Sequence, residues 1–317
     1  MTSLGANIAG QSNNTLLHNP QKGVALGFIG GIALSLDIPL IRMAGADPFV
    51  VMAARGFGLA LVLLFYSRWI SGSFANFYEE FRRRDFLIVG TLSGLNNVCF
   101  TLAVFNTSTA NVVFILAFNA MLAALISWPM TGEKPTIPTL AAIFATIVGV
   151  ALIVSESLGS GNLIGDALAL ACAALLAVSL TLTRKSGRDL SLAPGFGGLV
   201  SGLFALPTAL MLGAIPEAPV WLLLDAVVLV PIAGVTLWLA PRFITAPQVA
   251  LFYLLETVLA PLWVWMVFFE KPSQMVMIGG FIVVAAILGH TLYEISVSRQ
   301  KAKKLHFQTS ANKLPVQ

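Results

Sequence analysis

This sequence is poor in charged residues. Lys, Arg, Asp and Glu make up 10% of its 317 residues, whereas apolar residues make up 57%. A soluble domain usually carries about 25% charged residues, so this chain has too few polar side chains to cover a surface that faces water. Its two cysteines, Cys99 and Cys172, both lie within apolar runs, which argues against a scaffold of disulfide bonds.

The sequence also lacks the motifs of enzymes and of ATP-driven pumps. It has no glycine-rich loop with the Lys-Ser or Lys-Thr that holds phosphates, no His/Cys/Asp cluster with metal-site spacing and no nucleophile elbow. An intramembrane enzyme would need such a nucleophile and base, or a metal triad. We therefore expect no enzymatic activity, no cofactor and no metal, and we expect any transport to be driven by a gradient.

Apolar runs of membrane-spanning length recur along the whole chain. A run of about 20 apolar residues is long enough to cross a bilayer as a helix, and the runs predict an all-α integral membrane protein. Residues 1–21 are polar and lack the apolar stretch of a cleaved signal peptide, so we expect the first span to direct insertion. The ten predicted spans are 23–41, 48–69, 86–106, 108–130, 137–155, 163–183, 195–213, 220–240, 246–269 and 274–297.

The basic residues predict the orientation of these spans. With the N-terminus in the cytoplasm, fifteen Lys and Arg residues fall on the cytoplasmic side, whereas Arg42 and Lys271 fall outside and Arg55 lies within a span. Because positively charged loops stay in the cytoplasm, both termini are predicted to be cytoplasmic. The net charge of +4 is thus a signal for membrane topology and for contact with lipid head groups, and we expect no binding of nucleic acid.

One spanning segment occurs twice. Ala246–Pro272 aligns without a gap on Thr109–Pro135, 137 positions earlier, and both copies contain a Trp five residues before Glu-Lys-Pro, at Trp128 and Trp265. Further similarities at a spacing of 142 extend the repeat to helices 1–5 and 6–10. Because five is odd, the second copy enters the membrane from the opposite face, which predicts an inverted repeat with a transport site between its halves. The expected units are a polar cytoplasmic tail at 1–21, repeats at 22–156 and 162–298, and a basic cytoplasmic tail at 299–317.

The ten helices, the five-plus-five repeat and the closing Trp…Glu-Lys-Pro resemble EamA-type proteins of the drug/metabolite transporter superfamily. The resemblance covers roughly residues 22–298 and implies a membrane transporter. The sequence departs from the family pattern at three places. The second copy ends in Phe269-Glu270 where the first has the usual Gly-Glu, and the ninth helix has Glu256-Thr257 where Glu-Pro is common. Asp37 stands in a first helix that lacks the common Trp-Gly.

Glu256 and Asn119 are the first candidates for a binding site. Glu256 lies ten residues into its helix, about 15 Å along the axis, and Asn119 occupies the equivalent position of the other copy. An ionisable side chain at the centre of the membrane is usually functional, and Glu256 can also carry a coupling proton. The alternative is a protonated Glu256 that only forms a hydrogen bond between helices.

Asp37 and Arg55 form the second candidate pair. Asp37 lies five residues before Arg42, and Arg55 lies seven residues after Pro48. Both therefore lie roughly 8–10 Å below the outer boundary, on consecutive antiparallel helices. We expect an ion pair. It is either a structural pair, or an outer gate in which Arg55 also meets a carboxylate of the substrate.

Three further residues complete the predicted substrate pathway. Asn96 and Asn97 fall near the middle of the third predicted helix, where one amide can face the pathway while the other bridges helices. Tyr253 lies one turn before Glu256 on the same face, where it can stack on a substrate or pack in the core.

These observations predict a secondary transporter in the cell inner membrane. By analogy with the family, it would export a small polar metabolite or amino acid, zwitterionic or cationic, by alternating access. A carrier of a nucleotide-sugar or lipid-linked conjugate is the alternative, but it would need a basic cavity, for which only Arg55 is available. A membrane receptor that does not transport is the other alternative. A monomer and a homodimer are both compatible with the sequence.

Overall fold

A computed structural model describes residues 20–71, 81–131, 136–157, 162–186, 190, 192–213, 215–240, 243 and 246–311. Every regular element within these residues is a helix. In chain order they are α2 (Pro20–Ser35), α3 (Asp37–Met43), α4 (Pro48–Ser71), α6 (Arg84–Asn106), α7 (Thr109–Ala117), α8 (Asn119–Thr131), α9 (Ile137–Ser157), α10 (Leu163–Ser186), α11 (Ala193–Leu212), α12 (Pro219–Leu224), the π-helix η1 (Asp225–Leu229), α13 (Val230–Leu239), α14 (Ala246–Phe268) and α15 (Gln274–Ala311).

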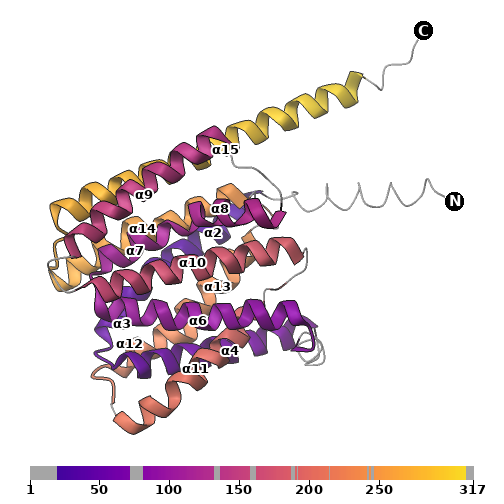
Figure 1. The fold of residues 1–317 in the computed structure, drawn as a ribbon. Helices are drawn as coiled ribbons and strands as arrows, with labels where there is room; N and C mark the ends of the chain where they lie inside the picture. Colours follow the sequence, from indigo (N-terminus) through magenta and orange to yellow (C-terminus); the bar gives the residue numbers. More distant parts are fainter. Residues whose placement is uncertain are drawn as a thin grey trace.

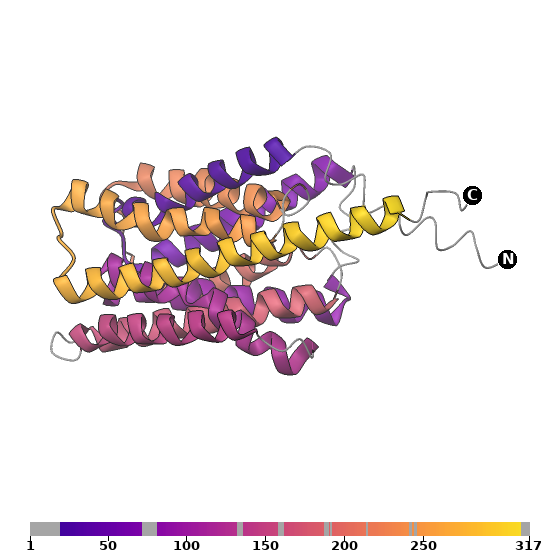
Figure 2. The ribbon, with the colours of Figure 1, turned by 90° about the horizontal axis from the view of Figure 1, so that it is seen from above.

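The helices lie side by side in one bundle, as Figures 1 and 2 show. Within the described residues, nine helical stretches are long and apolar enough to cross a membrane, and Leu255–Phe268 of α14 is a shorter apolar helix. The all-helical, multi-span architecture predicted from the hydropathy is therefore confirmed. Three predicted spans are composite: α2 and α3 form the first, α7 and α8 form the fourth, and α12, η1 and α13 form the eighth.

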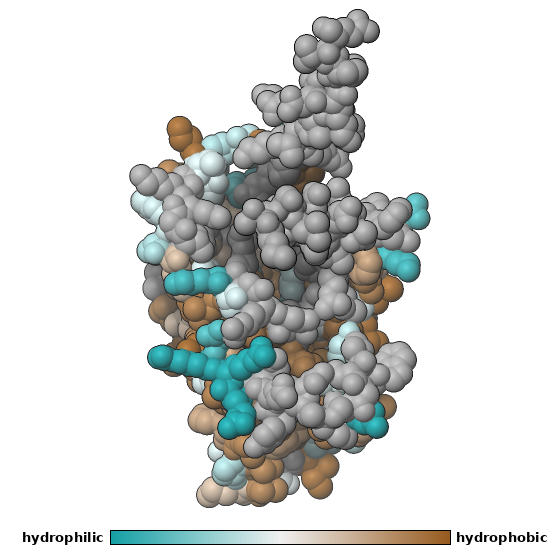
Figure 3. Space-filling view, turned by 90° about the vertical axis from the view of Figure 1, so that its right-hand side faces the viewer, coloured by the Kyte–Doolittle hydropathy of each residue, from teal (hydrophilic) through white to brown (hydrophobic). Residues whose placement is uncertain are grey.

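The two ends of the bundle differ in polarity. Figure 3 views the end toward which the C-terminal part of α15 points, and hydrophilic side chains gather there above the apolar flanks. The exposed basic residues at the ends of α2, α4, α6 and α10 belong to this end: Lys22, Arg68, Arg82, Arg83, Arg84 and Lys185. This distribution follows from the alternation of helix direction, because every second connection returns to the same end.

The last helix is longer than its predicted span. The sequence predicts that the span ends at residue 297 and that a polar tail follows, but α15 continues for 38 residues, from Gln274 to Ala311. At 1.5 Å per residue it is about 57 Å long, against a hydrocarbon core of about 30 Å. A helix can continue past the membrane because it satisfies its own backbone hydrogen bonds, so the change in polarity near Arg299 does not end it.

The closest helix contacts are made by glycines. A Cβ atom placed on Gly56 of α4 would lie 2.5 Å from the carbonyl oxygen of Gly198 on α11, and one placed on Gly197 would lie 2.6 Å from the carbonyl oxygen of Gly90 on α6. The pair Gly149 and Gly279 joins α9 to α15 in the same way. Small residues let helix backbones approach closely in a membrane. The largest apolar core surrounds α7, where three side chains are almost fully buried: Val112, Val113 and Ile115.

We predict that Gly198→Val destabilises the protein and that Gly234→Val does not. The backbone of Gly56 blocks the first site, whereas a Cβ at Gly234 meets nothing within 4 Å. Overpacking typically costs about 1–3 kcal/mol, and a surface substitution changes stability by about 0.5 kcal/mol or less. Thermal unfolding of the two variants in detergent measures the difference. Equal unfolding temperatures would contradict the close contact between α4 and α11.

Candidate functional site

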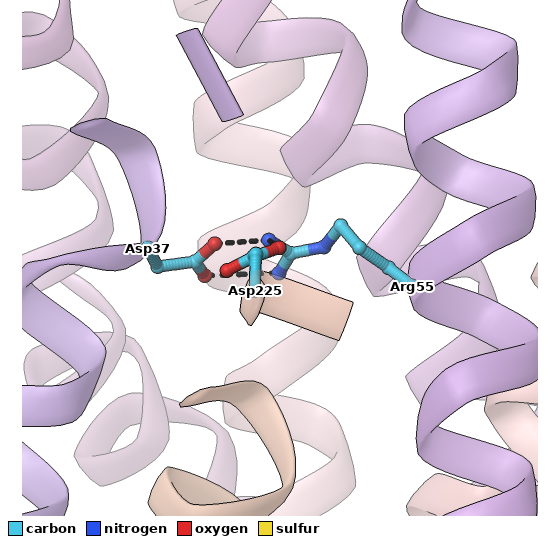
Figure 4. Close-up of polar contacts among 3 residues, drawn as sticks. All are labelled: Asp37, Arg55 and Asp225. Atoms are coloured by element: carbon cyan, nitrogen blue, oxygen red, sulfur yellow. Dashed lines mark hydrogen bonds and ion pairs between the residues drawn. The ribbon is translucent and has the colours of Figure 1, made fainter. Parts of the chain in front are cut away.

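A buried ion cluster connects three segments of the bundle. Arg55 of α4 lies between Asp37 of α3 and Asp225 of η1 (Figure 4). Its Nη1 donates to Oδ1 of Asp37 and, at 2.9 Å, to Oδ2 of Asp225, and its Nη2 donates to Oδ2 of Asp37 at 2.9 Å. The guanidinium carbon lies 5.3 Å from the ring centroid of Phe100 on α6. We call Asp37, Arg55 and Asp225 the triad.

Water hardly reaches the triad. The exposed fractions are 3% for Asp37, 6% for Arg55 and 0% for Asp225. Removing ions from water costs several kcal/mol per ion, which is offset only by close opposite charges and complete hydrogen bonding. The triad meets the first condition but not the second, because Nε of Arg55 and Oδ1 of Asp225 are buried without a hydrogen-bond partner among the described residues.

A break in the first span positions Asp37. Pro39 has no backbone N–H to donate to the carbonyl of Ser35, so the helix ends there and α3 begins at Asp37. The hydroxyl of Ser35 donates to the carbonyl of Ile32, and the indole N–H of Trp263 on α14 donates to the same hydroxyl. The break is thus held by its own turn and by α14, and Asp37 stands at the start of the second part of the span.

A second irregularity positions Asp225. It opens the π-helix η1, in which the N–H of Val230 donates to the carbonyl of Asp225, five residues back. Pro231 follows directly and cannot donate to the carbonyl of Val227, which favours a local change of helical register. π-helical turns are rare and often occur at functional sites.

Asp225 was not among the residues predicted from the sequence. It lies six residues after Pro219, about 9 Å along the helix axis, which is the depth expected for Asp37 and Arg55. A carboxylate at the same depth as a buried arginine was therefore a usable signal. The predicted ion pair considered only consecutive helices and therefore did not include Asp225, which is 170 positions from Arg55.

Glu256 and Tyr253 lie next to the triad on α14. Glu256 interacts electrostatically with Asp37 and Arg55, and Tyr253 interacts with Glu256. Tyr253 keeps 38% of its surface accessible and Glu256 is half-buried. These two side chains are therefore more accessible than the triad.

The three predicted asparagines make contacts between or within helices. Asn96 donates to the carbonyl and the Sγ of Cys172 on α10, at 2.8 and 3.0 Å, and Asn97 donates to Ser201 of α11 at 2.9 Å. Asn119 donates to the carbonyl of Leu116 at 2.8 Å, across the break between α7 and α8. All three amide nitrogens therefore donate to other groups of the bundle, and their role in a substrate pathway stays a prediction.

Two further polar contacts close the end of the bundle opposite to α15's C-terminus. Arg42 of α3 forms an ion pair with Glu270, which follows α14. Asp166 of α10 is buried and accepts hydrogen bonds from Thr107 at 2.7 Å and Asn111 at 3.0 Å. These contacts join connections that are far apart in the sequence. The first Glu-Lys-Pro triplet, at 133–135, lies outside the described residues.

Comparisons with known proteins agree with this architecture. Residues 21–155 match the model of the EamA-like transporter family, which belongs to the drug/metabolite transporter superfamily. The predicted family resemblance is confirmed over these residues. The EamA match and the apolar helices together indicate a multi-pass membrane protein.

The fold is also found among solved structures. A crystal structure of a protein with 17% sequence identity superposes with a TM-score of 0.59, over 88% of this chain and 98% of the other. At this identity the likeness shows the fold alone. No curated protein matches the sequence.

We predict unequal effects of removing the charges of the triad. Asp37→Asn leaves Arg55 paired with Asp225, whereas Arg55→Gln leaves two buried carboxylates without a counter-ion. Loss of one partner of a buried pair typically costs about 3–5 kcal/mol, so Arg55→Gln should lower the unfolding temperature far more than Asp37→Asn. The double variant should be less unstable than the sum of the single effects, since residues in contact couple. Additive effects of equal size would contradict the observed cluster.

Proposed function

We propose that this EamA-like protein is a secondary transporter that moves a small polar solute by alternating access. The observation that carries the proposal is the polar centre formed by the triad, Glu256 and Tyr253. Ionisable residues inside a membrane are costly and mark solute or ion pathways, and two discontinuous spans meet at this centre, as in many transporters. By analogy with the family, we propose export as the direction.

We also propose that residues 22–156 and 162–298 are two inverted repeats. The helix pairing supports this, because exchanging the two halves converts the most extensive contacts into one another or into themselves. The contact of α6 with α10 becomes that of α13 with α2, and α4 with α11, α7 with α14 and α9 with α15 convert into themselves. Gly56 and Gly198, which touch, are 142 positions apart, the spacing that already relates the start of the two halves.

The charge of the polar centre supports a zwitterionic or cationic solute. Three carboxylates, those of Asp37, Asp225 and Glu256, lie around one guanidinium. A nucleotide-sugar or lipid-linked phosphate would be repelled by this excess of negative charge, so we rank such conjugates below small amines and amino acids. Uptake into liposomes separates a transporter from a membrane receptor.

A thermal-shift screen of amino acids, amines and small organic acids against the purified protein should identify the solute. We predict that Glu256→Gln strongly reduces the stabilisation by that solute, because the carboxylate is the accessible acceptor for an ammonium group. Glu270→Gln is the matched control, since Glu270 lies at the helix end with Arg42 and should leave the stabilisation unchanged. Equal stabilisation of the wild type and Glu256→Gln would exclude Glu256 from the solute site.

We propose the cell inner membrane as the location, with both termini in the cytoplasm, because the exposed basic residues gather at one end of the bundle. In a variant without Cys99 and Cys172, single cysteines at Lys185 and Lys271 test the orientation. Both positions are exposed and lie at opposite ends of the bundle. An impermeant maleimide added to intact cells should label the cysteine at 271 and leave that at 185 unmodified. The reverse result would invert the topology.

A further inference from the structure

The two carboxylates of the triad cannot both be balanced by Arg55. A guanidinium stays charged at every pH that a protein experiences, and it supplies one positive charge against two aspartates. The next charged group is Glu256, which adds a third carboxylate. Away from their end turns, α2, α6, α11 and α13 contain no charged residue. Asp166, near the start of α10, accepts hydrogen bonds from Thr107 and Asn111. Arg42 pairs with Glu270 at the helix end. The triad therefore carries an excess negative charge if both aspartates are ionised.

The hydrogen bonds show which carboxylate bears the ionic interaction. Asp37 accepts from both terminal nitrogens of Arg55, the bidentate geometry of an ionised pair. Asp225 accepts from Nη1 through Oδ2 only. Its other oxygen, Oδ1, is fully buried and receives no hydrogen bond from the described residues. An ionised carboxylate in this position would leave an oxygen without a donor.

The two carboxylates also approach each other. Oδ1 of Asp37 and Oδ2 of Asp225 accept from the same nitrogen, Nη1 of Arg55, although two ionised carboxylates have only acceptors. Close carboxylates in a dry site share a proton, because like charges a few ångströms apart cannot both persist.

We propose that the triad is a proton-binding site, in which Asp225 holds one exchangeable proton next to the Asp37–Arg55 ion pair. This inference rests on the proposed transport function for its purpose, but the site itself is a property of the three side chains. The proton cancels the excess charge and provides a donor where none is otherwise present.

The position of Asp225 makes this proton releasable. Asp225 belongs to the π-helical turn η1, and Asp37 follows the break at Leu36, so two of the three segments are irregular where they meet. Movement of η1 away from Arg55 would bring Asp225 into contact with water. The carboxyl group then gives its proton to water and becomes a carboxylate, and it takes a proton up again when the triad closes. If the triad releases the proton to one side of the membrane and takes one up from the other side, this exchange couples solute movement to a proton gradient.

Infrared spectroscopy of the purified full-length protein tests the site without any solute. The carbonyl stretch of a protonated carboxyl group is separate from that of a carboxylate, and it shifts in deuterium oxide. The wild type at neutral pH should show this band. Asp225→Asn should lose the component of the band that belongs to the triad, and Asp37→Asn should lose it too, because Arg55 then balances a single ionised Asp225.

Two further variants give opposite or unchanged signals. Arg55→Gln should increase the band, since two aspartates without a counter-ion both take up protons, and Glu256→Gln should keep the component of the triad. Thermal unfolding shows whether each variant is folded, and Asp225→Asn, which preserves the Asp37–Arg55 pair, should unfold within a few degrees of the wild type.

Three outcomes would overturn the proposal. The first is a band that persists in full in Asp225→Asn and disappears in Glu256→Gln, which assigns the proton to Glu256. The second is a wild type that shows no protonated carboxyl band. The third is an unfolding temperature that rises with sodium chloride but not with choline chloride, which assigns the site to a metal cation. Failure of liposome transport would remove the proposed function and would leave the infrared result valid.

Discussion

The constraint on which this structure depends is the burial of one guanidinium with two carboxylates in an apolar bundle. Arg55 has 6% of its surface exposed and Asp225 has none. No single helix can supply all three groups, so the triad connects α3, α4 and η1 across 170 positions of sequence. The backbone is irregular where two of these groups are placed, because Asp37 follows a break caused by Pro39 and Asp225 opens a π-helical turn. The ion cluster and the irregular backbone therefore belong to one arrangement.

The scaffold around this centre is rigid for a different reason. Gly56 and Gly198 bring α4 and α11 into backbone contact, and Gly197 does the same for α11 and α6. Asn96 and Asn97 add side-chain bonds from α6 to α10 and α11. Arg55 thus projects from a helix that is fixed along one side. The elements that carry its partners contain the irregular turns, and the proposed proton release therefore places the movement in η1.

The sequence was sufficient to predict the spans but only part of the site. Hydropathy predicts helices well because the backbone in a membrane must satisfy its own hydrogen bonds. The contact between Asp37 and Arg55 could be predicted because consecutive antiparallel helices with a short connection lie together. To predict the contact of Asp225 with Arg55, one must know which distant helices meet, and hydropathy carries no information about this. The amide nitrogens of Asn96, Asn97 and Asn119 were indistinguishable from ligand-binding groups until their partners were visible.

The geometry distinguishes two candidate sites for a solute, the guanidinium of Arg55 and the accessible face of α14. Both hydrogens of Arg55 Nη1 are used by the aspartates, Nε is buried, and the ring of Phe100 lies against the guanidinium. A solute carboxylate that approached Arg55 would also approach Asp37, Asp225 and Glu256, and the repulsion would exceed what the remaining donor could offer. An ammonium group at Glu256 meets the opposite situation, because the same excess of negative charge attracts it. In the proposed transporter, this charge distribution favours the accessible face of α14 as the solute site and leaves Arg55 to the ion cluster.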